Sequence, residues 1–307
     1  GADIVQAAPY GLNGSGVTVM VDDGGFALAS HTDFGGRLTV RDSSGLSNHA
    51  THVCGTVGGS GAASAGLRKG MAPGVTIQSY GFQSDGSGIF LYSNPGDMQA
   101  DYNQAINVHG ADISNNSIGK NTCANGFPCN ITGDYGVTSA LIDNIVAGSL
   151  GSPMRIVWAN GNERGCTSCS AESPGGFHST APPACAKNHL TVGALNSNND
   201  SMPTFSSWGP CDDGRLKPDV SAPGCQSNDD GGVTSCSSSG NNSYTVFCGT
   251  SMASPTVCGL SSLLLQDYRV QFPGNPDFRN STLRTLFAHT AVDRGNVGPD
   301  YQFGYGS

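Results

Sequence analysis

Three short segments of the sequence carry side chains that can together perform acyl-transfer chemistry. Asp22 and Asp23 follow an apolar run, His49 lies in the polar segment 48–56, and Ser251 precedes a long stretch with almost no charge. Acyl transfer needs a hydroxyl nucleophile, an imidazole that takes its proton, and a carboxylate that fixes the imidazole tautomer. These segments therefore predict a site built from serine, histidine and aspartate.

Short apolar runs alternate with helical patterns along the chain, which is typical of an α/β fold with a parallel sheet flanked by helices. A proline near the start of a helical pattern and a glycine near its end support these boundaries. The expected strands are residues 17–21, 75–77, 111–113, 155–158 and 190–192, and the expected helices are 94–110, 137–146 and 256–268.

The expected strand ends bring the candidate residues into one region. Open parallel sheets bind ligands beyond the carboxyl ends of their strands. Asp22, the segment 115–117 and Asn162 each follow an expected strand. We therefore expect them to converge on a single crevice.

Composition excludes several classes of protein. The chain has 307 residues, of which 45 are glycine and only 12% are charged, and its net charge is −9. With 14 Lys and Arg residues in total, it lacks the basic surface that nucleic acid requires. No apolar run approaches the roughly 20 residues of a membrane-spanning helix. Hydrophobic residues make up 37%, which is too many for a disordered acidic chain.

The eleven cysteines indicate disulfides in an exported protein. Their spacing matches no zinc-ligand set, and Cys166 and Cys169 form a C-x-x-C pair outside the strand–turn–helix context of a thioredoxin site. Cys123 and Cys129 bracket a short loop and are expected to close on each other. Because eleven is odd, at least one cysteine has no partner within the chain.

Further motifs identify a family resemblance. Together with the three segments above, they resemble the active-site signatures of the subtilisin-like serine proteases (subtilases, family S8), in the family's order from Asp22 to Ser251. The additional motifs are residues 70–73, 85–88, 116–119, 159–162 and 217–224. Residues 4–7, 186–188 and 191–194 most resemble the oxidatively stable alkaline protease branch. The resemblance implies a subtilisin-like three-layer fold with a mostly parallel central sheet.

The resemblance implies a role for each matching residue. Ser251 matches the nucleophile, His49 the general base, and Asn162 the side-chain donor of the oxyanion hole, with the Ser251 N–H as second donor. Asp22 matches the carboxylate that orients His49; Asp23 is the alternative, and register with the family motif favours Asp22. His52 is expected to be a structural histidine.

Two backbone edges are expected to hold the substrate as an added strand. They match Gly86, Ser87 and Gly88 on one side and Ser117, Ile118 and Gly119 on the other, while Ala159, Asn160 and Gly161 match the wall of the first specificity pocket. Asn160 replaces a small residue, so we expect a more polar pocket. None of these residues is acidic, and a broad preference for apolar or aromatic side chains follows from the resemblance.

Three further cysteines depart from the family pattern near the site. Cys54 and Cys258 occupy positions of small residues on two helices that should pack closely, so they are buried thiols or a mutual disulfide, with thiols favoured. Cys248 lies three residues before Ser251 and is expected to hold that loop in place.

The resemblance as a whole implies a secreted serine endopeptidase acting on protein or peptide substrates. We expect residues 1–307 to form one catalytic domain, with an inhibitory propeptide and a further β-rich domain outside this chain, and we expect a monomer. The chemistry needs no cofactor, and the resemblance implies structural Ca²⁺, for which residues 198–200 and 229–230 are candidates. The alternatives are a non-catalytic binding module of the same fold, an acid-acting sedolisin relative, and a metal- or thiol-dependent enzyme.

Overall fold

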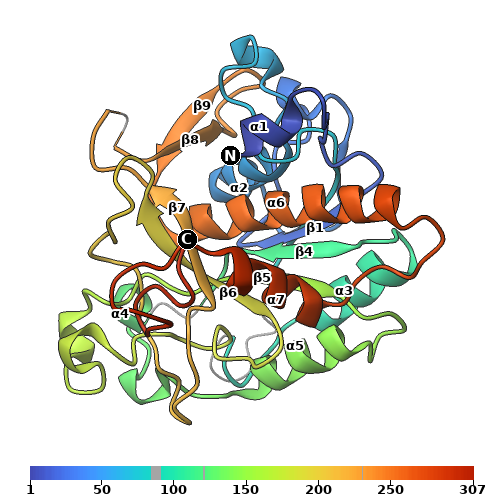
Figure 1. The fold of residues 1–307 in the computed structure, drawn as a ribbon. Coiled ribbons are helices and arrows are strands. Elements are labelled where there is room, and N and C mark those ends of the chain that lie inside the picture. Colours follow the sequence, from blue (N-terminus) through green and yellow to red (C-terminus); the bar gives the residue numbers. More distant parts are fainter. Residues whose placement is uncertain (84–90, 120–121, 230) are drawn as a thin grey trace.

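A seven-stranded parallel sheet organises the chain in the computed structural model, which describes residues 1–83, 91–119, 122–229 and 231–307 (Figure 1). The strands lie in the order β2-β3-β1-β4-β5-β6-β7. Their bounds are β1 Thr18–Asp23, β2 Leu38–Val40, β3 Thr76–Gly81, β4 Ile113–Asn116, β5 Arg155–Ala159, β6 Leu190–Asn196 and β7 Val220–Cys225. All pairs in this sheet are parallel, as the sequence pattern predicts.

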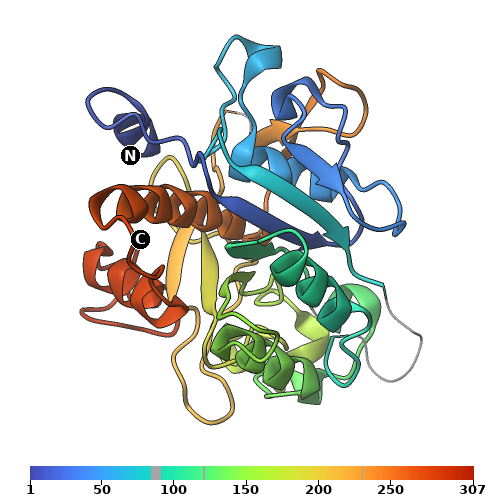
Figure 2. The same cartoon turned by 90° about the vertical axis from the view of Figure 1, so that its right-hand side faces the viewer.

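Helices cover both faces of this sheet, which gives three layers (Figures 1 and 2). Helices α2 (Asn48–Gly58) and α6 (Thr250–Gln271) pack on one face, and α3 (Met98–Asn107) and α5 (Val137–Ala147) on the other. The remaining helices are α1 Ala2–Gln6, α4 Thr122–Asn125 and α7 Asn280–Thr290. The predicted fold class, a three-layer α/β fold with a parallel central sheet, is confirmed. Within the described residues, no helix combines the length and the apolar character needed to cross a bilayer.

Strand β1 is buried on both faces, because helices cover the sheet above and below. Its side chains alternate between the two faces with a period of two. Val19 and Val21 join the hydrophobic core under α2 and α6, while Met20 joins the core under α3 and α5. The same alternation places Asp22 and Asp23, the last two residues of the strand, on opposite faces.

Helix α6 begins at Thr250, six residues before the start that the apolar pattern predicts. Pro255 lies within the helix and lacks the N–H that would bond to the Ser251 carbonyl. That carbonyl instead accepts a hydrogen bond from Ser117 Oγ at 2.9 Å. The proline therefore frees a backbone acceptor that ties the start of α6 to the end of β4.

The remaining expected elements agree with the structure in type and differ at their ends. Helix α3 begins at Met98 rather than at residue 94, because the Asn94 side chain accepts a bond from Gly96 N in a preceding turn. The short edge strand β2 and strand β7 carry apolar patterns too brief to have been predicted. A two-stranded hairpin, β8 (Val233–Cys236) and β9 (Tyr244–Phe247), packs beside α2.

The disulfides correct one expectation. Cys123 does not bond to Cys129; the bonds are Cys123–Cys166 and Cys129–Cys169. The two cysteines of the C-x-x-C motif, Cys166 and Cys169, therefore bond to two different partners. Two parallel cross-links hold the loops after β4 and β5 together, whereas a bond within the short loop would have fixed that loop alone. A further disulfide joins Cys225 to Cys248. Cys54 and Cys258 are buried thiols, in line with the favoured reading.

Candidate active site

A cavity of about 450 Å³ lies at the carboxyl ends of β1, β4 and β5, where the sequence predicts a crevice. His49, Ser251 and Asn162 all line it, and so do the predicted substrate-binding residues Ser117, Ile118, Gly119, Ala159, Asn160 and Gly161. Asp22 does not line it. Gly86, Ser87 and Gly88 fall outside the described residues.

The carboxylate that contacts His49 belongs to Asp23. Asp23 Oδ1 lies 2.7 Å from His49 Nδ1 and also accepts a bond from Gly24 N at 2.7 Å. The prediction that Asp22 fills this place is corrected by this geometry. His49 projects from the first turn of α2, which covers the face of the sheet that Asp23 shares with Val19 and Val21. Strand alternation is therefore the physical reason for the correction.

Asp22 lies on the opposite face, in a different environment. It is fully buried, and neither of its carboxylate oxygens has a hydrogen-bond partner among the described residues. Burial raises the pKa of Asp22 well above its usual value, and the nearby carboxylates of Asp101 and Asp97 raise it further. Burial therefore favours the protonated, uncharged form of Asp22, which lies on the side of the sheet away from His49.

The His49 imidazole is poised as a proton acceptor. Burial alone would lower the pKa of His49, but the charge of Asp23 and its hydrogen bond outweigh burial and raise that pKa above 6.5. Since Asp23 accepts at Nδ1, the neutral ring carries its proton there and leaves Nε2 with a free lone pair. A histidine held in this tautomer is suited to take a proton from a hydroxyl group.

Ser251 is the second residue of α6 and sits at the positive end of the helix dipole. Its Oγ donates to the Ser117 carbonyl at 3.3 Å, and no hydrogen bond joins Ser251 to His49 within the described part of the chain. Both side chains line the same cavity. Hydrogen bonds between catalytic groups are often long or unformed until substrate binds, so rotation of the serine side chain is required to bring Oγ to the imidazole.

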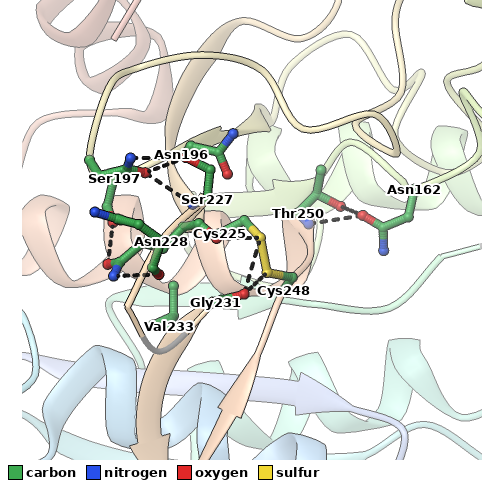
Figure 3. Close-up of a disulfide and its surroundings, with 12 residues drawn as sticks. Asn162, Asn196, Ser197, Cys225, Ser227, Asn228, Gly231, Val233, Cys248 and Thr250 are labelled. Carbon is green, nitrogen blue, oxygen red and sulfur yellow. Dashed lines mark hydrogen bonds between the residues drawn. A yellow bond between two sulfur atoms is a disulfide. The ribbon is translucent and has the colours of Figure 1, made fainter.

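Asn162 is held by its side-chain oxygen, and its amide nitrogen has no hydrogen bond among the described residues. Its side-chain oxygen accepts bonds from Thr250 N at 2.9 Å and Thr250 Oγ1 at 3.0 Å, as Figure 3 shows. Thr250 Oγ1 also accepts from Gly161 N at 3.1 Å. Thr250 therefore fixes the end of β5 against the start of α6, and Asn162 Nδ2 remains available as a donor to a ligand in the cavity.

Phe247 is a site residue that the sequence reasoning missed. Its ring lines the cavity and lies against both histidines, with centroid distances of 6.3 Å to His49 and 4.9 Å to His52. The His52 ring is fully buried and bonds to the Val233 carbonyl at 2.8 Å, and burial lowers its pKa to about 4. His52 is thus a neutral structural residue. The aromatic residue four positions before Ser251 was the available signal for Phe247.

Asn160 does not make the pocket polar in the way expected. Its Nδ2 donates to the Ser207 carbonyl at 2.6 Å, and its Oδ1 accepts from Thr180 Oγ1 at 3.1 Å. The residue is fully buried and lines the cavity, and both polar atoms of its amide have protein partners. A buried amide binds protein partners first, so residue type alone does not predict how polar the pocket is.

The Cys225–Cys248 disulfide joins the end of β7 to the loop before Ser251 (Figure 3). Cys248 lines the cavity, and the neighbouring Gly249 N donates to the Gly224 carbonyl at 2.9 Å. The disulfide and the backbone hydrogen bond both join residues 224–225 to residues 248–249. The expectation that Cys248 fixes the nucleophile loop therefore has a structural basis.

The loops proposed for calcium do not fit that ion. Asp200 pairs with Arg294 at 2.6 Å, and the Asn198 side chain bonds to Ser227. Asp229 contacts Gln226, and residue 230 is outside the described residues. Calcium prefers a shell of six to eight oxygen atoms. The two clusters of potential metal ligands found among the described residues each contain cysteine, and in one of them the sulfurs form a disulfide.

Comparisons with known proteins identify the family of the chain. Residues 14–306 match the profile of the family described as the subtilase family. The chain is 31% identical to "Subtilisin DY" of Bacillus licheniformis over 99% of this chain and 92% of that protein. It is 29% identical to "Alkaline serine exoprotease A" of Vibrio alginolyticus and to "Serine protease AprX" of Bacillus subtilis (strain 168), over 94% and 90% of this chain. It spans 49% and 61% of the lengths of these two relatives.

Solved structures give the same result for the fold. A cold-adapted subtilisin-like serine proteinase superposes with a TM-score of 0.60 at 26% identity, over 91% of this chain and 84% of the other. The CspB protease of Clostridium perfringens superposes with a TM-score of 0.76 at 16% identity, over 99% of this chain and 95% of the other. The latter likeness concerns the fold alone.

Proposed function

The chain belongs to the subtilase family of serine endopeptidases, and we propose that it cleaves peptide bonds with Ser251 as nucleophile, His49 as general base and Asp23 as the carboxylate that orients His49. The observation that carries this proposal is the 2.7 Å contact between His49 Nδ1 and Asp23 Oδ1, in the same cavity as Ser251. Asp23 takes the role in place of Asp22, which faces away from the imidazole.

In the proposed mechanism, His49 Nε2 accepts the Ser251 hydroxyl proton as Oγ attacks the substrate carbonyl. Asp23 stabilises the imidazolium that forms, because its carboxylate already bonds to Nδ1. His49 then gives the proton to the leaving amine, and an acyl-enzyme remains on Ser251. Water activated by His49 hydrolyses this ester and restores the free serine.

The oxyanion of each tetrahedral intermediate is proposed to lie between Asn162 Nδ2 and Ser251 N–H. Thr250 N and Thr250 Oγ1 both donate to the amide oxygen of Asn162, so the amide nitrogen is oriented before substrate binds. The Ser251 N–H lies in the first turn of α6, where backbone donors have no partner within the helix. Donors fixed in advance stabilise developing charge without reorganisation during the reaction.

The proposed substrate is an extended peptide with an apolar or aromatic side chain in the first pocket. The segments 117–119 and 159–161 form two walls of the cavity. Among the described lining residues, Asp23 is the only carboxylate, and it is bonded to His49. The cavity therefore offers no free acidic group that would select Lys or Arg.

The same proposal includes an extracellular, monomeric enzyme that needs no cofactor for its chemistry, with residues 1–307 as one catalytic domain and a propeptide as its inhibitor. Three disulfides support an oxidising compartment. The reaction is complete with the serine, histidine and aspartate side chains and water, so no step calls for a bound metal.

A fluorophosphonate probe tests the proposal. The active protein should be labelled stoichiometrically at Ser251 and should lose cleavage of an unfolded protein substrate in proportion to labelling. The variant Ser251→Ala should be neither labelled nor active, while the control Ser254→Ala, a buried α6 serine that bonds to Asn115, should be labelled normally. A folded wild-type protein without labelling would instead favour a non-catalytic binding module.

A further inference from the structure

The described structure contains five cysteines outside disulfides: Cys54, Cys185, Cys211, Cys236 and Cys258, all of them buried. Two of them lie together. Cys185 precedes β6 and Cys211 follows it, on two segments that border the substrate-binding wall. We propose that Cys185 and Cys211 close a fourth disulfide, which cross-links the two segments that hold the Asn160 side chain.

The backbone already places these two segments side by side. His178 N donates to Gly209 O at 3.0 Å, and Thr180 N donates to Trp208 O at 3.2 Å. These bonds run between residues 178–180 and 208–209, just before each cysteine along its own segment. Closing the disulfide therefore joins chain segments that are already paired.

Arg215 fixes the two cysteines more locally. Cys211 N donates to Arg215 O at 3.0 Å, and the Arg215 guanidinium donates to Cys185 O at 2.8 Å. One residue thus bonds to the backbone of both cysteines. The two side chains lie within interaction range, since the Cys211 thiol affects the pKa of Cys185 and the Cys185 thiol affects the pKa of Cys211. Together with the backbone bonds, this places the two sulfur atoms close together, as a disulfide requires.

Among the described residues, the other three thiols have no hydrogen bond to another thiol, although Cys236 and Cys258 lie near enough to Cys54 to affect its pKa. Cys236 Sγ donates to Asp33 Oδ2 at 3.5 Å. The fully buried Cys258 on α6 has no thiol hydrogen bond among the described residues. The proposal therefore leaves Cys54, Cys236 and Cys258 as free thiols.

The chemistry is a thiol–disulfide exchange with an organic disulfide, RSSR. The Cys211 thiolate attacks one sulfur of RSSR, forms a mixed disulfide and expels RS⁻, which takes up a proton. The Cys185 sulfur then loses its proton, attacks Cys211 Sγ and expels the second RS⁻. The two cysteine thiols are oxidised by two electrons, and RSSR is reduced to two RSH.

Both sulfurs are fully buried in the folded protein, so the exchange takes place during folding. The Cys185–Cys211 disulfide would stabilise the segments that support Asn160 in the pocket wall. Cys185 Sγ contacts the Thr180 carbonyl at 3.8 Å, and Thr180 Oγ1 bonds to Asn160. Ser207, four residues before Cys211, accepts the other Asn160 bond. The disulfide thus links the two supports of the Asn160 amide.

Peptide mapping of the wild-type protein tests the proposal. The protein is folded in a glutathione disulfide/glutathione buffer, inactivated, denatured with N-ethylmaleimide and digested with chymotrypsin without reduction. Cleavage after Phe177, Leu190, Trp208 and Leu216 yields peptides 178–190 and 209–216, each with one cysteine. We expect these two peptides to be cross-linked. Maleimide on both Cys185 and Cys211 in that digest overturns the proposal.

Single variants give a second readout that does not depend on peptide recovery. With the fourth disulfide, the unreduced wild type carries three maleimide groups, and Cys185→Ser carries four because Cys211 is released. The control Cys258→Ser carries two. If the pair stays reduced, the wild type carries five and both variants carry four. The change on mutating Cys185 therefore has opposite sign in the two cases, and a fall from five to four refutes the disulfide.

Discussion

Replacing each of the two adjacent aspartates by asparagine separates their roles. Asp23→Asn removes the charge beside His49 and keeps the shape of the side chain, whereas Asp22→Asn changes a buried carboxyl group on the other face of the sheet, where burial raises its pKa. We expect Asp23→Asn to reduce kcat strongly and Asp22→Asn to leave kcat within about twofold. The same substitution at adjacent positions thus serves as its own control.

The size of the effect follows from the distance. The Asp23 carboxylate and the His49 imidazolium lie with N and O atoms 2.7 Å apart, which places their charge centres about 4 Å apart. At an effective dielectric constant of about 20, such a pair interacts by about 4 kcal/mol. Since about 1.4 kcal/mol corresponds to a factor of ten in rate, the loss is about 10³ in kcat. An asparagine that favours the wrong imidazole tautomer extends the loss toward about 10⁴.

The assay is steady-state hydrolysis of a chromogenic peptide, with burst titration to count active sites and circular dichroism to confirm folding. KM should change little in Asp23→Asn, because the carboxylate bonds to His49 and acts through it. A loss of about 10³ in Asp22→Asn together with near-normal turnover in Asp23→Asn would refute the reasoning. It would show that strand alternation does not decide which carboxylate reaches the imidazole.

Three further predictions address the oxyanion donor, the pH profile and the disulfide beside the site. Asn162→Ala should lower kcat by about 10²–10³ with little change in KM, a range measured on the corresponding asparagine of a subtilisin; unchanged kcat would remove Asn162 from the oxyanion site. In a kcat/KM profile, activity should rise with pH through a midpoint above 6.5, because His49 must lose its proton and Asp23 raises its pKa, and a midpoint below 6.5 would contradict this. Replacing Cys225 and Cys248 by serine removes a cross-link across 23 residues and should lower the free energy of unfolding by about 3 kcal/mol. Chemical denaturation measures this change, and an unchanged unfolding midpoint would show that the disulfide does not stabilise the protein.

The sequence predicted the elements that carry the site because their signals are local. The buried strand before Asp22 and the helix near Ser251 each show a short-range apolar pattern, and the structure contains both of them. The helix at His49 was expected from the family resemblance and is also present. The helix at Ser251 extends further toward its N-terminus than its apolar pattern, since its first turn is polar. Short strands such as β2 carry too few residues for a pattern.

Side-chain alternation along the strand bears on the choice between the two aspartates. Val19 and Val21 share a face with the residue two positions further along, which is Asp23. Deciding that this face is the one covered by α2 nevertheless required the packing of the helix on the sheet. Alignment with the family motif gave the wrong residue, because the motif can be matched to either aspartate by moving the alignment one position.

By itself, the sequence determined the set of chemical groups: a serine, a histidine, an adjacent pair of aspartates and an asparagine, each at the end of a recognisable element. These depend on residue type and on patterns within a few positions. Only the tertiary structure decided which aspartate reaches His49, that Asn160 turns its amide to Thr180 and Ser207, and which cysteines are neighbours. The reason is that these contacts join segments far apart in the chain, and packing of helices and loops on the sheet sets their distances.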